Sequence, residues 1–407
     1  MAGSEEQVAT DPSPRKFVVD VSERDQNDLK LRLRLARYPD QINGAGWEYG
    51  TELEYLKELM TYWKDQFSWP QQQAWMNSHF NHFKLQLGGL DVHFVHHPSK
   101  KPGATPLLLV HGWPGSFLEF QKIIPMLEQG GNYHLVALSL PGFGFSSAPQ
   151  DAGFGVPQHA ATCNQLMLAL GYPKYVAQGG DWGGDIVFTL GCHHSANCKA
   201  IHTNFPIAVP KLRQLGHLSQ YINSKLPILN QIPLTMTQRE LEGMKRNEWF
   251  LDKHRGYYSI QMTQPQTLGY GLQDSPTGLA AWLVEKFRSY SDCNGNVETR
   301  FSKHELLTMF SLYWFTGTIA SSMRIYKESN MLEFRQRNLA ENHCGVPSAV
   351  AIFPKELFQA PKAWLQQQYN LKSYSTFDSG GHFAALEEPS ALVRDMCQFY
   401  SSLTLQA

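Results

Sequence analysis

A glycine-rich segment in the middle of the chain, Gly179-Gly180-Asp181-Trp182-Gly183, constrains the fold more than any other feature. It follows an apolar run at residues 175–178 and leads into a second one at 184–190. A strand that turns directly into a helix needs glycines at the turn, because they permit a strained backbone and close packing. The segment therefore predicts a nucleophile elbow with aspartate where serine is usual. The alternative is a solvated acid in a surface turn.

Short apolar runs alternate with helical segments on both sides of this elbow. Strands are predicted at 107–110, 135–140, 175–177 and 200–204, and again at 348–353 and 371–377. Continuous apolar runs of this length are typical of parallel strands that are buried on both faces. The sequence from about 207 to 341 has a helical and aromatic pattern without strand signals. We therefore expect an α/β protein whose mostly parallel central sheet is interrupted by an inserted helical lid.

The first hundred residues have a different pattern. Residues 1–15 are polar and predict a flexible tail, and 16–21 predict a strand. Helices are expected at 22–35 and 51–67, followed by a β-hairpin around Gly88-Gly89. The expected organisation is thus a tail (1–15), an N-terminal module (16–105), a core (106–206 and 342–407) and a lid (207–341).

The amino-acid composition indicates which classes of ligand and which cellular location to expect. The 407-residue chain has a formal net charge of −1, which gives no reason to expect a nucleic acid or an anionic membrane as a partner. Its six cysteines are scattered without metal-site spacing, which indicates reduced thiols and a cytoplasmic protein. No run of eighteen apolar residues occurs, so we expect no membrane anchor. A small-molecule substrate is the expected ligand.

Two residues near the carboxyl end could complete a catalytic triad with Asp181. His382 follows Gly380-Gly381 just after the last predicted strand, and Glu356 follows the strand before it. The order nucleophile, acid, histidine is that of the α/β-hydrolase triad, so the α/β-hydrolase fold is predicted. Asp378, four residues before the histidine, is the rival acid.

A second glycine-rich segment, His111-Gly112-Trp113-Pro114-Gly115, follows the first buried strand. In this fold an oxyanion donor comes from that position, which makes the backbone N–H groups of Trp113 and Trp182 the candidates. Pro114 has no N–H to donate. The alternative is a plain glycine-rich turn.

An aspartate nucleophile changes the expected reaction. A carboxylate is suited to displacement at a saturated carbon, which leaves the carbonyl of the new ester on the protein. His382, oriented by Glu356, would then activate a water that attacks this carbonyl, and the N–H groups would hold the oxyanion. Epoxides and alkyl halides are the two substrate classes that fit. A catalytically silent receptor with the same fold is a further alternative.

Five segments together resemble the microsomal-type epoxide hydrolases, and most closely the soluble fungal members. They are 37–97, 111–115, 179–183, 257–289 and 380–387. The resemblance implies hydrolysis of an apolar epoxide to a vicinal diol, an N-terminal module that wraps the core and reaches the lid, and a homodimer.

The same resemblance implies two lid tyrosines that donate hydrogen bonds to the epoxide oxygen. They correspond to Tyr257 and Tyr326, with Tyr258 and Tyr313 as the alternatives if the register is shifted. No cofactor fingerprint occurs, and the histidine pairs lack a third ligand at a recognisable spacing. We therefore expect neither a cofactor nor a metal.

Overall fold

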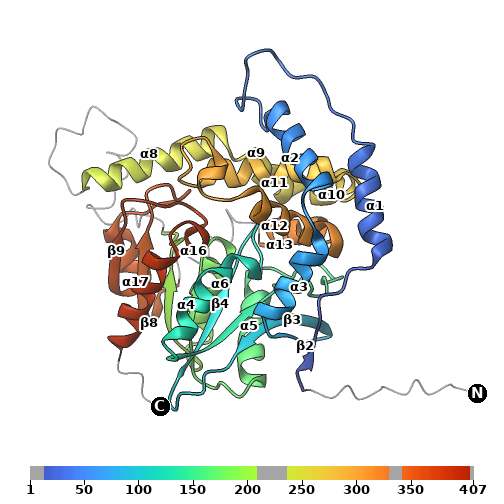
Figure 1. Ribbon diagram of the computed structural model, residues 1–407. Coiled ribbons are helices and arrows are strands. Elements are labelled where there is room, and N and C mark those ends of the chain that lie inside the picture. The colour runs from blue at the N-terminus through green and yellow to red at the C-terminus, as the bar shows by residue number, and fades with distance from the viewer. Residues whose placement is uncertain (1–12, 209–235, 330–341, 404–407) are drawn as a thin grey trace, which may run out of the picture.

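A nine-stranded sheet lies at the centre of the computed structural model, which describes residues 13–208, 236–329 and 342–403 (Figure 1). Its spatial order is β1-β2-β3-β5-β4-β6-β7-β8-β9. Neighbours from β5 to β9 are parallel, whereas β1, β2 and β3 continue the sheet antiparallel beyond β5. The mostly parallel sheet predicted from the sequence is confirmed. The strands are β1 (Arg15–Lys16), β2 (His82–Leu87), β3 (Leu90–His97), β4 (Thr105–Val110), β5 (Tyr133–Leu138), β6 (Tyr175–Gly179), β7 (Cys198–Thr203), β8 (Cys344–Ile352) and β9 (Tyr369–Thr376).

Helices cover both faces of the parallel part. The crossovers from β4 to β5 and from β5 to β6 step in opposite directions along the sheet, so right-handed connections put α4 and α5 on opposite faces. Helix α17 packs on α4, and α6 packs on α5. The helices of this part, with one short 3₁₀ helix, are η1 (Phe117–Gln121), α4 (Ile123–Gln129), α5 (Val156–Ala169), α6 (Trp182–His193), α15 (Lys362–Gln368), α16 (Ala384–Glu387) and α17 (Pro389–Ser401).

The N-terminal elements connect the edge of the sheet to the lid. They are α1 (Glu23–Arg34), α2 (Leu53–Asp65) and α3 (Trp69–His79), ahead of the β2–β3 hairpin. Helix α2 buries an apolar stripe that includes Trp63, whose indole N–H donates to the Ser311 hydroxyl at 3.1 Å. The strand expected at 16–21 is wrong beyond Lys16, because side chains of α3 bond that backbone instead. Val19 and Val21 donate to the side chains of Asn77 and Gln73.

The lid helices lie together above the end of the sheet (Figure 1). Their bounds are α8 (Gln238–Lys253), α9 (Gly256–Thr263), α10 (Pro265–Asp274), α11 (Pro276–Tyr290), η3 (Val297–Thr299), α12 (Lys303–Thr316) and α13 (Ile319–Ser329). Gly317 has a φ of 65°, in the left-handed region, and separates α12 from α13.

Some expected segments lie outside the described residues. They include most of the expected tail at 1–15, and 209–235 and 330–341 of the expected lid. The boundaries between tail, module, core and lid stay predictions.

Candidate active site

Asp181 occupies the turn between β6 and α6. Its backbone has φ 51° and ψ −131°, a strained conformation for a residue with a side chain. Close packing explains the surrounding glycines. A Cβ on Gly179 would lie 2.3 Å from the carbonyl oxygen of Gly183, and one on Gly183 would lie 2.0 Å from the carbonyl oxygen of Val110. The turn thus projects Asp181 beyond the carboxyl end of a central strand.

One oxygen of this carboxylate is held by the loop after β4. The backbone N–H of Trp113 donates to Asp181 Oδ1 at 2.8 Å. Gly112 makes this approach possible, because a Cβ there would lie 2.3 Å from the same oxygen. Trp182, the other expected donor, is the first residue of α6 and follows Asp181 directly. An oxygen in this position would remain hydrogen-bonded if negative charge developed on it.

His382 faces the other carboxylate oxygen. Its Nε2 lies 3.3 Å from Asp181 Oδ2, and its Nδ1 lies 2.6 Å from Glu356 Oε1. Glu356 is fully buried. The rival acid Asp378 instead has a fully exposed side chain and pairs with Arg239 at 3.2 Å. Of the two acids, only Glu356 therefore contacts the imidazole.

The two carboxylates set the charge state of the histidine. Burial acts to lower the pKa of His382, but the carboxylates of Glu356 and Asp181 outweigh it and raise the pKa well above its usual value. Loss of charge on either acid would therefore lower the pKa of this imidazole.

Both lid tyrosines lie on the tryptophans of the two glycine-rich loops. Tyr257, on α9, stacks on Trp113 with ring centroids 5.4 Å apart and planes 12° apart. Tyr326, on α13, meets Trp182 edge-on at 4.9 Å. Its buried hydroxyl makes no hydrogen bond of ordinary geometry within the described part of the chain. Burial, reinforced by Asp181, raises the pKa of both tyrosines, so both remain protonated donors.

The alternative tyrosines are placed differently. The buried Tyr313 hydroxyl donates to the carbonyl oxygen of Gly115 at 2.9 Å, which leaves it no proton for a substrate. Tyr258 packs edge-on against Tyr326 with ring centroids 5.5 Å apart. Asp181, His382, Glu356, Tyr257 and Tyr326 thus converge from the sheet end and the lid.

Comparisons with known proteins match this arrangement over nearly the whole chain. Residues 14–120 match the family model "Epoxide hydrolase N terminus", and 105–231 match the model of the alpha/beta hydrolase fold. A putative epoxide hydrolase of Stigmatella aurantiaca is 38% identical over 95% of this chain and 84% of its own length. Epoxide hydrolase 1 of Sus scrofa is 38% identical over 99% of this chain and 92% of its own. The structure of Aspergillus niger epoxide hydrolase superposes with a TM-score of 0.84 at 32% identity and covers 96% of both chains.

The chain belongs to the epoxide hydrolase family. The family and the α/β-hydrolase fold expected from the sequence are both confirmed.

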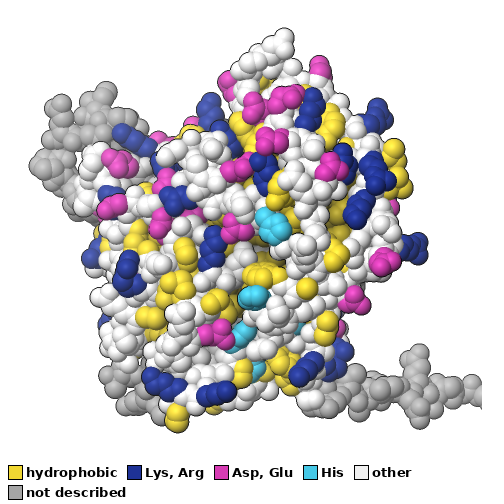
Figure 2. Space-filling view, in the orientation of Figure 1, with side chains coloured by type: hydrophobic (Ala, Val, Ile, Leu, Met, Phe, Trp, Pro, Cys, Tyr) yellow, Lys and Arg dark blue, Asp and Glu magenta, His cyan; other side chains and the backbone are white. Residues whose placement is uncertain are grey.

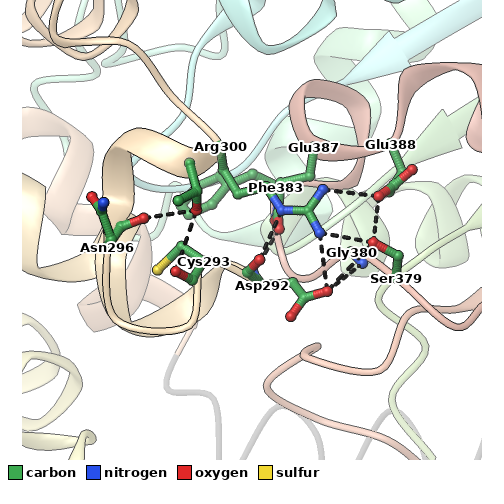
Figure 3. Close-up of polar contacts among 10 residues, drawn as sticks. Asp292, Cys293, Asn296, Arg300, Ser379, Gly380, Phe383, Glu387 and Glu388 are labelled. Atoms are coloured by element: carbon green, nitrogen blue, oxygen red, sulfur yellow. Dashed lines mark hydrogen bonds and ion pairs between the residues drawn. The ribbon is translucent and has the colours of Figure 1, made fainter.

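The lid of this epoxide hydrolase also braces the loop that carries His382 (Figure 3). Arg300, between η3 and α12, donates to Ser379 at 2.7 Å, to Glu388 at 2.9 Å and to Asp292 at 3.1 Å. These contacts hold the two ends of the histidine loop against one lid segment.

Backbone hydrogen bonds add to this brace, the set of contacts between the lid segment and the histidine loop. Asp292 accepts the N–H of Gly380 at 3.0 Å, and the N–H of His382 donates to the carbonyl oxygen of Tyr290 at 3.0 Å. Glu387 accepts the N–H groups of Asp292 and Phe383, at 2.7 and 3.0 Å. Sequence reasoning missed this cluster, because its members lie in two segments about ninety residues apart (292–300 and 379–388) and form no local motif.

We also searched the surface and the rest of the described chain for charged patches, metal sites and membrane-spanning helices. Acidic and basic side chains are interspersed over the face in Figure 2. In the described ranges, no three His, Cys, Asp or Glu side chains come together in a way that could hold a metal ion. None of the described helices is long and apolar enough to cross a membrane.

Proposed function

We propose that this enzyme converts an apolar epoxide and water into a vicinal diol through an ester on Asp181. Asp181 Oδ2 attacks a ring carbon, and the bond between that carbon and the epoxide oxygen breaks. Tyr257 and Tyr326 donate hydrogen bonds to this oxygen, and one of them gives up its proton, so the oxygen becomes a hydroxyl group on the neighbouring carbon. The observation that supports this most is the position of the carboxylate. One of its oxygens accepts the Trp113 N–H, and the other faces His382 Nε2.

The second step hydrolyses the ester. His382, oriented by Glu356, takes a proton from water, and the water oxygen attacks the carboxyl carbon of Asp181. The N–H groups of Trp113 and Trp182 stabilise the oxyanion. The bond between the Asp181 carboxyl carbon and the substrate oxygen then breaks, and His382 gives its proton to that oxygen, which releases the diol. The second water proton passes from the Asp181 carboxyl group to the tyrosinate, which restores the free enzyme.

Oxygen-18 water tests this route. In a single turnover with enzyme in excess over styrene oxide, one label should enter the carboxylate of Asp181 and not the diol. Label that appears in the diol during the first turnover would contradict the covalent route. Asp181→Ala should form no ester, whereas His382→Gln should accumulate one that mass spectrometry detects.

One observation also fits a second reaction, the dehalogenation of an alkyl halide. The buried indole N–H of Trp182 lies beside Tyr326 and has no hydrogen bond of ordinary geometry to the described residues. An N–H donor next to the nucleophile could stabilise a departing halide, as dehalogenation of an alkyl halide requires. The two protonated tyrosines favour an epoxide oxygen instead. A halide-release assay with bromoalkanes separates the two reactions.

The cytoplasmic location and the homodimer remain predictions. Light scattering of the purified enzyme would test the dimer, and cell fractionation would test the location.

A further inference from the structure

Glu119 is a half-buried acid that the proposed reaction does not yet use. It belongs to η1, directly after the loop that carries Trp113. Its carboxyl group folds back over Gly115, where a Cβ would lie 1.2 Å from Glu119 Oε1. Gly115 therefore leaves the space that this carboxyl occupies.

A narrow cavity joins this carboxyl to the catalytic residues. Glu119, Gln178, Asp181 and His382 all line it, and its size suits about one water molecule. Gln178 donates its amide N–H to Asn204 at 3.0 Å, while its own buried Oε1 has no partner in the described chain. A buried acceptor without a partner is costly, so a donor is expected to reach it from within the cavity.

The cavity is separate from the side where the epoxide would bind. Neither Tyr257 nor Tyr326 is among its lining residues, whereas Asp181 and His382 are. A molecule in it would thus approach Asp181 from the histidine side, away from the lid tyrosines. This position suits the water of the second step and not the epoxide of the first.

From these contacts we infer that Glu119 positions the hydrolytic water, together with His382. The inference rests on the proposed function. The water donates one hydrogen to His382 Nε2 and the other to Glu119, so that its lone pair points to the carboxyl carbon of Asp181. The first proton moves to His382 as the new carbon–oxygen bond forms. It then passes to the alkoxide oxygen of the diol as the ester bond breaks.

The charge state of Glu119 suits this role. Burial raises its pKa to about 8, with the charge of Asp181 adding to the rise and His382 opposing it. The acid is then mainly neutral at pH 7. Its carbonyl oxygen can accept from the water, and its O–H can donate to an acceptor such as Gln178 Oε1. A glutamine at 119 should reproduce the acceptor, whereas a leucine should not.

The test compares Glu119→Leu and Glu119→Gln in the full-length enzyme with styrene oxide. Stopped-flow tryptophan fluorescence follows ester formation, and acid-quenched samples are analysed by mass spectrometry for ester on Asp181. We expect Glu119→Leu to slow ester hydrolysis by about 10- to 100-fold and to accumulate ester, because a misplaced water reacts slowly. Ester formation should change by less than about threefold, and Glu119→Gln should hydrolyse the ester within about threefold of the wild-type rate.

Tyr313→Phe is the matched control, because its hydroxyl contacts the same loop at Gly115 without lining the cavity. It should not accumulate ester. If Glu119→Leu hydrolyses the ester at the wild-type rate, or slows both steps equally, the role of Glu119 is wrong. A Glu119→Gln variant as slow as Glu119→Leu would also overturn it. If the wild-type enzyme forms no ester at all, the proposed function itself fails.

Discussion

The ring of Tyr257 lies parallel to the indole of Trp113, and the backbone N–H of the same tryptophan donates to Asp181 Oδ1. One residue therefore connects a lid helix to the oxygen that would carry the negative charge. Because the tyrosine rests on this tryptophan, the position of its hydroxyl relative to the nucleophile depends on the loop that forms the oxyanion site. In the proposed mechanism, ring opening and ester hydrolysis therefore both depend on Trp113 but use different protons.

Loss of a lid hydroxyl should affect ring opening alone. Tyr257→Phe and Tyr326→Phe each remove one donor to the epoxide oxygen, so we expect ester formation to slow by roughly 10- to 100-fold. Ester hydrolysis should stay within about threefold of wild type. Stopped-flow fluorescence measures both steps.

Tyr313→Phe serves as the control for this pair, because its hydroxyl is committed to the carbonyl oxygen of Gly115. Ester formation in this variant should remain close to wild type. Equal slowing of both steps in the Tyr257 or Tyr326 variants would indicate a disturbed fold instead of a lost donor.

Removing the charge of Glu356 should slow ester hydrolysis and shift its pH dependence. Only neutral His382 can accept a proton, and Glu356 raises the pKa of that imidazole. Glu356→Gln should therefore move the rising limb of the hydrolysis rate to lower pH. The maximum rate should fall by about 100-fold or more, since the imidazole loses its orienting partner. Single-turnover hydrolysis from pH 5 to 9 measures both effects.

Asp378→Asn is the matched control, because that acid is fully exposed and contacts Arg239 instead of the histidine. Its pH profile should match wild type. A shifted profile for Asp378→Asn, with an unchanged one for Glu356→Gln, would show that the orienting acid has been misassigned.

Esterification should itself lower the pKa of His382. Asp181 contributes to the raised pKa in the free enzyme, and its negative charge disappears when the ester forms. The base form of the histidine should therefore appear at a lower pH in the intermediate than in the free enzyme. NMR titration of the free enzyme gives one value, and the pH dependence of ester hydrolysis gives the other. A value that is the same or higher in the intermediate would argue against this coupling.

A side chain at Gly112 should disrupt the oxyanion site. The Cβ of Gly112→Ala would overlap Asp181 Oδ1, so the Trp113 N–H would be displaced from that oxygen. Loss of one such donor costs about 3 kcal/mol of transition-state stabilisation, and kcat/KM should fall at least about 100-fold. Gly345→Ala is the control, because its Cβ would meet nothing within 4 Å. Full activity of Gly112→Ala would mean that the donor has no catalytic role.

Loss of Arg300 should loosen the histidine loop. Arg300→Met removes the contacts to Ser379 and Glu388, so His382 should be held less firmly while Asp181 stays in place. We expect ester hydrolysis to slow by about 10-fold, with a smaller effect on ester formation.

Arg32→Met provides the control, because this arginine also reaches a lid residue, Asp274, but far from the histidine loop. Rapid-quench analysis should find no accumulated ester in this variant. An Arg300→Met enzyme that hydrolyses its ester at the wild-type rate would exclude a role for the brace.

Local sequence patterns were sufficient to predict the parallel strands and the turn at Asp181. Apolar runs located the parallel strands, and the glycines around Asp181 indicated the strained turn that the structure contains. Both features can be recognised in the sequence because each depends on residues that are close together in the chain. Burial of a strand depends on the hydrophobicity of its side chains, and the tight turn depends on glycines that lack a Cβ atom. The strand expected at 16–21 was wrong because side chains of a later helix bond its backbone.

By itself the sequence determined the fold and family and predicted the type of chemistry. An aspartate in an elbow, a histidine after the last strand and their chain order can all be read from the sequence alone. Only the tertiary structure showed that Glu356 contacts His382 while Asp378 is exposed, and that the Tyr313 hydroxyl bonds to the backbone. Exposure and hydroxyl partners depend on packing between distant segments. The same holds for the brace at Arg300. Such contacts join elements that are far apart in the sequence, so no local sequence pattern predicts them.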